Sequence, residues 1–525
     1  MNHFVKGQFK VGQFRPLLQK LRTTSNRQLK HPHRTVRMMT MSFLSARHDH
    51  LVLGQTGPLP FFPRVKIPQR ARAAHTYVVG ITGQGKSKLL EHTLFQDITQ
   101  GRGCGLLDPH SDLASDTLRY LASWHDKSYM DKPYLHDPKN LKRIIYFDPS
   151  RTDYILPFNV LDTQFGTYET AQNIVEAFRR TWPQSLAEAP QFSNIALAAL
   201  ITLIENKQTL VDMHRLLTDD DFREEMLAHV SNSEVVAFFH DRYDRWGREA
   251  PLMRESTLNK VAAFTFNPQL RLILGSKENA LDFRRIMDEG QVLIVDLGRC
   301  DPETRRLLGS LIVTGLELAA LSRKDIDRVE ERRPFHFYLD EFQDFCASEG
   351  SAKTFSQILS ECRKFGLHLT LAHQTLSQLG QRMIGALGNI QTKVVFAVDR
   401  SDAEILARKL FSVNGERVKH TVNDDAQQDR THPVFYSLQE EWEKCVQTIQ
   451  NLPPRKALVK AQGRGLRMLR TIQVQDGGCS EKQLETLKRY LAGIPGVRHA
   501  GMQQASARGY GGDEVRKEPI FWESA

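Results

Sequence analysis

A glycine-rich segment has the residue types and spacing of a loop that binds phosphate. Residues 80–87 read G-I-T-G-Q-G-K-S. Glycines suit this task because several backbone N–H groups must turn inward around an anion, and a residue without a Cβ does this with little strain. The lysine can reach the β- and γ-phosphates of ATP, and the serine hydroxyl can bind Mg²⁺. The expected nucleotide-binding residues are Gly80, Thr82, Gly83, Gln84, Gly85, Lys86, Ser87 and Lys88.

A pair of acidic residues at the end of an apolar run offers the second half of a hydrolytic site. The run Phe335–Leu339 is followed by Asp340 and Glu341. A phosphate-binding loop alone only holds a nucleotide, whereas hydrolysis also needs a carboxylate for the metal and a base for the water. We expect Asp340, with Ser87, to hold magnesium, and Glu341 to orient and deprotonate the water. The alternative, two solvent-facing acids at a strand end, is disfavoured by the loop at 80–87.

Two further polar residues are candidates with open alternatives. Gln374 follows the apolar run His368–Ala372, and an amide there can both donate to a phosphate and accept from water. It can equally cap a turn. Arg363 lies eleven residues earlier, where an arginine can reach the next subunit and stabilise a transferring phosphate. A solvated helical arginine is the simpler interpretation of Arg363 from the residues alone.

The elements that must position these residues follow an alternating pattern. Short β-rich apolar runs are followed by turns and helical stretches, which is typical of a parallel α/β sheet. Seven strands are expected, at Thr76–Val79, Cys104–Leu107, Arg143–Phe147, Val292–Val295, Phe335–Leu339, His368–Ala372 and Lys393–Val398.

Other parts of the chain differ from this pattern. Between the third and fourth strands only helical segments are expected, including Tyr168–Arg180, Phe192–Glu205 and Thr257–Phe266. A β-hairpin is expected from Lys456–Lys460 and Met468–Val474. The predicted organisation is an ATPase domain of residues 51–166 and 289–475, an inserted all-helical domain of 167–288, and a C-terminal helix with a flexible tail in 476–525.

The net charge of +10 is concentrated at one end of the chain. Residues 1–50 contain ten Lys or Arg and one acid, a balance of +9, so the other 475 residues carry about +1. We expect a basic, disordered arm that either contacts phosphates or is only solvated. The six cysteines have no metal-ligand spacing, and no apolar run reaches the roughly 18 residues that span a bilayer.

Four motifs in order resemble the HerA/FtsK superfamily of ring-forming DNA pumps, and within it the TraG/TraD-like coupling proteins of type IV secretion and conjugation. They are H-T-Y-V-V-G-I-T-G-Q-G-K-S ending at Ser87, L-L-D-P-H-S-D-L-A at Leu106–Ala114, F-Y-L-D-E-F at Phe337–Phe342 and R-K-F-G-L-H-L-T-L-A-H-Q at Arg363–Gln374. The resemblance covers residues 50–475 and implies a RecA-like P-loop core with a mainly parallel sheet and an inserted helical domain.

The resemblance also implies a DNA-stimulated ATPase that uses ATP and Mg²⁺ and assembles as a hexamer around DNA. By that analogy Gln374 senses the γ-phosphate, Arg363 acts on the neighbouring subunit's nucleotide, and Asp108 borders the pocket. Coupling proteins usually begin with transmembrane helices, whereas this N-terminus is hydrophilic and basic. We therefore expect a cytoplasmic protein that either reaches the inner membrane through a separate membrane protein or is a soluble relative serving a mobile element. Relaxosome and secretion-channel proteins are the expected partners. Alternatives are a HerA-like translocase with a nuclease partner, a non-hydrolysing ATP-binding adaptor, and a module that binds DNA through its basic arm alone.

Overall fold

The computed structural model describes residues 50–57, 62–123, 134–162, 165–187, 191–246, 250–345, 349–423, 431–461, 463–472, 474 and 477–492. The predicted basic arm, apart from His50, and the predicted tail beyond residue 492 lie outside these ranges. The chain divides into two units, Met1–His50 and Leu51–Ala525. The sheet and the described helices belong to the second unit.

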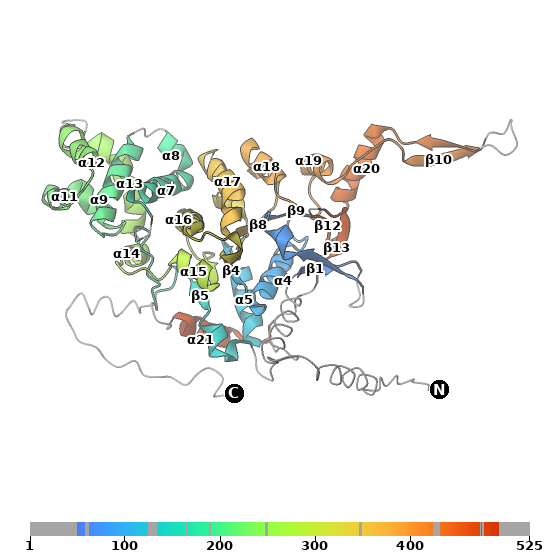
Figure 1. Ribbon diagram of the computed structural model, residues 1–525, viewed down its shortest axis with the longest axis horizontal. Helices are drawn as coiled ribbons and strands as arrows, with labels where there is room; N and C mark the ends of the chain where they lie inside the picture. The colour runs from blue at the N-terminus through green and yellow to red at the C-terminus, as the bar shows by residue number, and fades with distance from the viewer. Residues whose placement is uncertain are drawn as a thin grey trace, which may run out of the picture. The chain divides into compact units, whose positions relative to one another are not determined.

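An eleven-stranded sheet forms the centre of this unit, with the strand order β2-β1-β13-β12-β9-β3-β8-β7-β4-β6-β5 (Figure 1). The seven strands from β9 to β5 are parallel, and they are the seven that the sequence predicts. The strands are β1 (His50–Gln55), β2 (Arg64–Pro68), β3 (Thr76–Val79), β4 (Gly103–Asp108), β5 (Ile144–Phe147), β6 (Val292–Asp296), β7 (Phe335–Leu339), β8 (Leu367–His373), β9 (Thr392–Val395), β12 (Lys456–Lys460) and β13 (Arg467–Arg470).

The antiparallel edge was only partly foreseen. The predicted hairpin is present as β12 and β13, and β12 pairs antiparallel with β9. The second of its strands begins at Arg467 and ends at Arg470, short of the predicted Val474. The strands β1 and β2 were not predicted, although β2 alternates buried and exposed residues in the manner of a half-covered strand.

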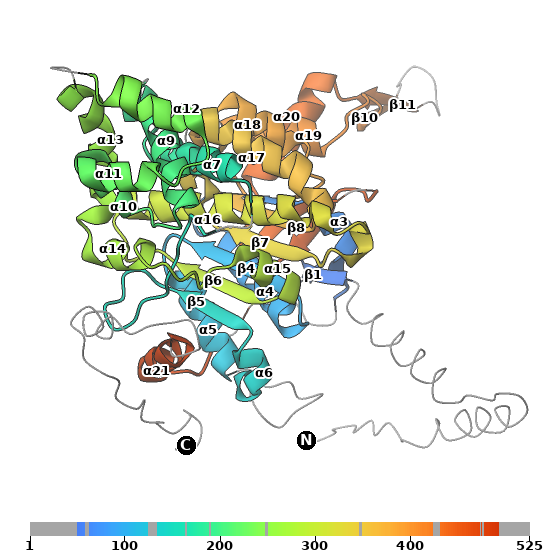
Figure 2. The ribbon, with the colours of Figure 1, turned by 60° about the vertical axis from the view of Figure 1, so that its left-hand side comes forward.

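Helices cover both faces of the sheet. Successive residues of a strand are buried alternately against the helices of one face and those of the other. In β7, Phe337 and Leu339 pack with the helices of one face, while Tyr338 packs with those of the other. Figure 2 shows α4, α5 and α21 on one side and α16 to α20 on the other. The core helices are α3 (Gln69–Arg72), α4 (Lys86–Thr99), α5 (Asp112–Ser123), α6 (Pro138–Leu141), α16 (Pro302–Ser322), α17 (Glu349–Glu361), α18 (Gln381–Gly388), α19 (Arg400–Leu410), α20 (Leu438–Gln450) and α21 (Glu481–Ala492).

The segment between β5 and β6 is helical, and its described residues contain no extended strand. Its most apolar helix, α9, is buried on most sides and spans the predicted range. The boundaries 167 and 288 stay predictions, because these helices share one continuous hydrophobic cluster with the sheet. The helices are α7 (Thr167–Thr181), α8 (Pro183–Ala187), α9 (Phe192–Glu205), α10 (Asp212–Thr218), α11 (Asp220–Leu227), α12 (Ser233–Ala237), α13 (Ala250–Thr265), α14 (Pro268–Leu274) and α15 (Phe283–Glu289).

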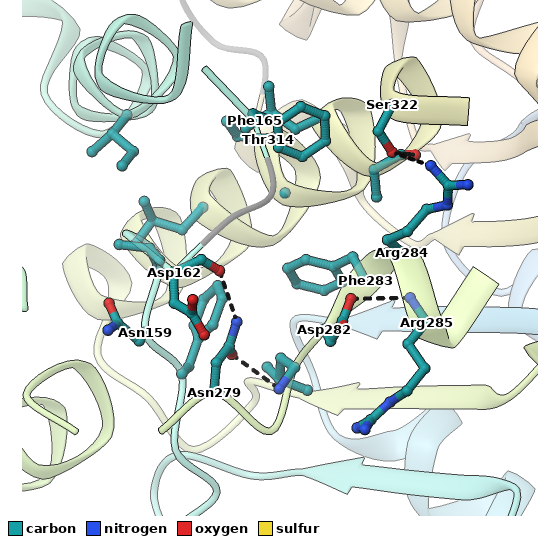
Figure 3. A pocket seen from close by; sticks show the side chains of 18 residues that line it. Asn159, Asp162, Phe165, Asn279, Asp282, Phe283, Arg284, Arg285, Thr314 and Ser322 are labelled. Atoms are coloured by element: carbon teal, nitrogen blue, oxygen red, sulfur yellow. Dashed lines mark hydrogen bonds between the residues drawn. The ribbon is translucent and has the colours of Figure 1, made fainter. Parts of the chain in front are cut away.

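A cavity of about 160 Å³ lies where this helical segment joins the sheet. The chain segments that enter and leave the helices run side by side there, since Phe158 N donates to Ile273 O at 2.9 Å. Figure 3 shows the side chain of Asn279 bridging the two segments: its amide donates to Asp162 O at 3.4 Å, and its carbonyl accepts from Leu281 N at 3.1 Å. The joint is therefore held by backbone and amide hydrogen bonds as well as by apolar packing.

Helix α16 approaches α15 closely at this joint. A Cβ added to Gly315 would lie 2.3 Å from the Phe283 ring, so a larger residue must displace that ring. A Cβ added to Gly385 in α18 would meet no atom within 4 Å.

Replacing these two helical glycines should change stability in opposite directions. Gly315→Ala should lower the free energy of unfolding by about 1–3 kcal/mol, because overpacking forces Phe283 to move. Gly385→Ala should raise it by about 0.5–1 kcal/mol, because alanine is the better helix former. Thermal unfolding of the two variants beside the wild type measures both effects, and equal stabilisation by both would contradict the close packing at Gly315.

Candidate active site

The glycine-rich loop connects β3 to α4, and its conformation depends on two glycines. Gly83 has φ of 79° and Gly85 has φ of 103°, values that side chains with a Cβ rarely adopt. The buried Lys86 is the first residue of α4, and its Nζ donates to Gly80 O at 2.7 Å. Burial lowers the pKa of Lys86, although the charges of Glu341 and Asp340 oppose the change. The lysine is thus already drawn back toward the loop.

The acidic pair lies beyond the carboxyl end of β7, beside that loop. Asp340 and Glu341 are both buried. Burial, with the nearby charges of Glu341 and Asp108, raises the pKa of Asp340 to about 6. Glu341 has φ of 45°, a left-handed conformation that costs energy for a residue with a side chain. The pair is therefore a concentrated negative charge suited to a cation.

Gln374 joins the loop to the acidic pair. Thr82 Oγ1 donates to Gln374 Oε1 at 3.1 Å, and Gln374 Nε2 donates to Glu341 Oε1 at 2.9 Å. The other carboxylate oxygen of Glu341 accepts from Gln343 Nε2 at 2.7 Å. One amide thus links the loop to the carboxylate through hydrogen bonds on both of its polar atoms.

Asp108 ends β4 next to β7, and its side chain is engaged by the backbone. One oxygen accepts from His110 N at 2.9 Å and the other from Ala114 N at 2.8 Å. Burial raises the pKa of Asp108. These bonds fix the turn that begins α5, so Asp108 shapes the site with its own hydrogen bonds already made.

Most of the predicted residues meet around one cavity of about 480 Å³. Gly80, Gln84 and Arg363 are predicted site residues that do not line it. Gly80 nevertheless accepts from Lys86, and Gln84 O accepts from Arg455 N at 2.8 Å. The lining residues are Thr82, Gly83, Gly85, Lys86, Ser87, Lys88, Asp108, His110, Asp112, Leu113, Asp340, Glu341 and Gln374.

Several residues at the site were not assigned from the sequence. His110 and Asp112 line the cavity and belong to the motif at Leu106–Ala114, whose spacing marked only Asp108. Gln343 follows the acidic pair by two residues and could have been found from that proximity. Arg455 gives no local signal, because it reaches Gln84 only through the antiparallel return of β12.

A buried ionic cluster fixes α4 against β7. Arg72 donates to both oxygens of Asp97 at 2.7 and 2.6 Å, and Tyr338 OH donates to the same carboxylate at 2.6 Å. All three side chains are almost fully buried. Burial acts to raise the pKa of Asp97, but the charge and hydrogen bonds of Arg72, together with the charges of His336 and Arg102, hold that pKa well below its usual range. Because Asp97 belongs to α4 and Tyr338 to β7, the cluster ties the helix that follows the loop to the strand that precedes the acidic pair.

Arg363 lies at the opposite edge of the sheet from this cavity. It belongs to a short 3-10 helix, Cys362–Phe365, that precedes β8, whereas Gln374 follows β8. Seven strand residues at about 3.3 Å each place the two more than about 20 Å apart. The Arg363 side chain is exposed. Arg363 therefore cannot contribute to the cavity of its own chain.

Comparison with known proteins identifies the family to which the chain belongs. The model of the family described as type IV secretion-system coupling protein DNA-binding domain matches residues 61–465. The chain belongs to this family. The predicted resemblance to TraG/TraD-like coupling proteins is confirmed. No curated protein matches the chain in sequence.

Solved structures share the coupling-protein fold at low sequence identity. The unbound bacterial conjugative coupling protein TrwBdeltaN70 is 18% identical, with 80% of this chain and 90% of that chain covered and a TM-score of 0.55. TrwB in complex with ADP and Mg²⁺ is 17% identical, with 81% and 96% covered and a TM-score of 0.52. VirB4 of Thermoanaerobacter pseudethanolicus is 12% identical, with 81% and 96% covered and a TM-score of 0.50. The predicted P-loop α/β core is thus confirmed.

Among the described helices, none combines the length and the apolar character that crossing a membrane requires.

Substitution within the glycine-rich loop should show that the stability of the loop depends on residues that adopt a positive φ. Gly85→Ala should lower the free energy of unfolding by about 1–2 kcal/mol, because φ of 103° is strained for alanine although space for a Cβ exists. Gln84→Ala, next to it in the loop, should change stability by less than about 0.5 kcal/mol. Chemical denaturation of both variants gives the difference, and a Gly85→Ala variant as stable as Gln84→Ala would refute the strained loop.

Proposed function

We propose that the chain is a coupling protein that hydrolyses ATP to move DNA in conjugative transfer or type IV secretion. The observation that carries the proposal is the convergence of the phosphate-binding loop, the acidic pair and Gln374 on one cavity in a member of the coupling-protein family. Structures of TrwB with ADP and Mg²⁺ and with a non-hydrolysable ATP analogue support the choice of nucleotide and metal.

The cavity has the groups that Mg²⁺ and ATP require. Backbone N–H groups of the loop, the positive end of α4 and the ammonium of Lys86 suit the phosphates. Ser87 and Asp340 supply the oxygen donors that Mg²⁺ prefers, and the cation would stabilise the ionised form of Asp340. Bound Mg²⁺ neutralises charge on the phosphates during phosphoryl transfer.

Glu341 is the proposed base for the attacking water. Its two oxygens are held by Gln374 and Gln343, so the carboxylate is oriented before a nucleotide arrives. Gln374 also accepts from Thr82, and a γ-phosphate entering the loop would compete for these polar groups. Gln374 therefore couples the presence of the γ-phosphate to the position of the base.

Removing the base should separate nucleotide binding from turnover. Glu341→Gln should bind ATP with Mg²⁺ but lose turnover by about 100-fold or more, because an amide accepts no proton. Fluorescent-nucleotide titration measures binding, and phosphate release with and without DNA measures turnover. Gln343→Leu removes one hydrogen bond to Glu341 but keeps the carboxylate, so it serves as the control and should lose less turnover than Glu341→Gln. Normal turnover by Glu341→Gln would overturn the role of the base, and DNA stimulation in the wild type would exclude the non-hydrolysing adaptor.

The positions of the loop and Arg363 at opposite ends of the parallel strands are consistent with assembly of the chain into a ring. The loop lies at one edge, and the exposed Arg363 lies at the other. An arginine that cannot reach its own cavity can reach the cavity of a neighbouring copy in a head-to-tail contact, and such contacts close into rings. We infer a homo-hexamer with DNA in its channel, which recruits relaxosome and channel proteins and meets the membrane through a partner.

Mixing two inactive variants tests the shared site. Lys86→Ala and Arg363→Ala should each abolish turnover. Together they should recover some activity, since about one interface in four would pair an intact loop with an intact arginine by random assortment. The measurement is phosphate release after co-assembly verified by mass. Mixed rings without any recovery would refute the action of Arg363 between subunits.

A further inference from the structure

A β-hairpin between α19 and α20 forms a small sheet of its own. Its strands are β10 (Val418–Asn423) and β11 (Thr431–Phe435), and they pair only with each other. Figure 1 shows them at the far end of α20, away from the central sheet. Every side chain whose exposure is described in the two strands is exposed. A two-stranded hairpin with both faces in water is marginally stable on its own.

Several large apolar side chains are exposed on this hairpin and at the adjoining start of α20. Val418 is 48% exposed, and Phe435, which lies directly opposite it in the register, is 49% exposed. Val434 and Leu438 are also exposed. Within the described part of the chain, four of the eleven exposed large hydrophobic residues fall in the 21 residues 418–438. Such clustering marks a surface that another molecule covers.

The base of the hairpin is firmly attached to α20. The buried Glu441 accepts from Arg417 N at 3.2 Å and from Gly415 N at 3.4 Å. The Lys444 ammonium lies 3.5 Å from the centre of the Tyr436 ring. The hairpin is thus held at a defined position while its apolar side chains stay in water.

The hairpin emerges at the edge of the sheet that also carries Arg363. Lys460 Nζ donates to Lys409 O at 2.8 Å, so the end of α19 lies beside the end of β12. The antiparallel register places Lys460 opposite Lys393, at the amino end of β9. Because β9, β3 and β8 are parallel, the hairpin emerges toward the amino ends of these strands, the side on which Arg363 also precedes β8.

We propose that the hairpin is an arm that docks on the neighbouring copy of this chain in the ring. The proposal rests on the head-to-tail assembly proposed above, in which the edge with Arg363 faces the next subunit. Burial of Val418 and Phe435 there would add apolar contact to the interface between subunits. The arm would hold the interface together while the nucleotide changes.

The charges of the sequence favour a protein surface over DNA. The connecting residues 424–430 contain Asp424, Asp425 and Asp429 against one base, Arg430, which does not suit phosphate. That charge is complementary to β12 and β13, since residues 455–471 contain six Lys or Arg and no acid. A second copy of the chain supplies such a surface.

A photoreactive phenylalanine analogue, p-benzoylphenylalanine, at position 435 tests the proposal directly. Irradiation of the full-length protein with ATP analogue, Mg²⁺ and DNA should give covalent dimers. Mass spectrometry should place the second end of the cross-link on the other copy. The same analogue at Phe266, which is 80% exposed in the helical segment, is the control and should give few dimers. Cross-linking to DNA, or no more dimer than the control gives, would overturn the proposal that the hairpin docks on a neighbouring copy.

A double variant measures what the arm contributes to assembly. Val418→Ser with Phe435→Ser should raise the protein concentration needed for ring formation by about tenfold or more, as judged by sedimentation. Phe266→Ser should leave that concentration unchanged. If the wild type and the double variant assemble equally well, the docking role of the hairpin is refuted, whereas the proposed ring assembly is retained. A wild type that stays monomeric with nucleotide and DNA would refute both proposals.

Discussion

The parallel register of β3, β8 and β7 is the constraint on which the candidate site depends. Val79 lies opposite His373, and Leu339 lies opposite Leu371, so the three strands end at nearly the same level. The glycine-rich loop, Gln374 and the acidic pair follow those three ends directly. Side chains that are far apart in the sequence therefore come within hydrogen-bond distance, because the register of the strands positions them. The buried cluster around Asp97 then holds the first and third of these strands in place through α4.

Strand β8 has a second consequence because both of its ends carry a functional candidate. Gln374 at one end contacts Glu341 and Thr82 of its own site, and Arg363 lies before the other end. All seven residues of the strand are buried. A packed central strand moves as a rigid body, so in the proposed ring a shift at Gln374 would be felt at the neighbour's nucleotide. In the proposed ring, the Thr82–Gln374–Glu341 chain of hydrogen bonds would be the element that rearranges when a nucleotide binds.

The sequence was sufficient for the parts of the molecule that obey local rules. The seven parallel strands are short continuous apolar runs because both of their faces are buried, and Phe335–Leu339 is typical. The loop and acidic pair could be predicted because each is contiguous in sequence and lies at a strand end. Arg455 could not, because its contact with Gln84 exists only through an antiparallel return from a distant strand. Strand β2 was missed for another reason: its five residues alternate, which is a weak signal at that length.

The hairpin escaped prediction for a physical reason that also bears on its role. A strand that packs on its own core shows a periodic pattern of apolar residues, because one face must be buried. In Val418 to Asn423 and Thr431 to Phe435, every side chain whose exposure is described is exposed, so these short runs show no buried face among the described residues. Yet the pair keeps Val418, Val434 and Phe435, which a permanently solvated hairpin gains nothing from exposing. Apolar side chains that stay exposed on a hairpin held in a defined position are what a surface completed by another chain should carry.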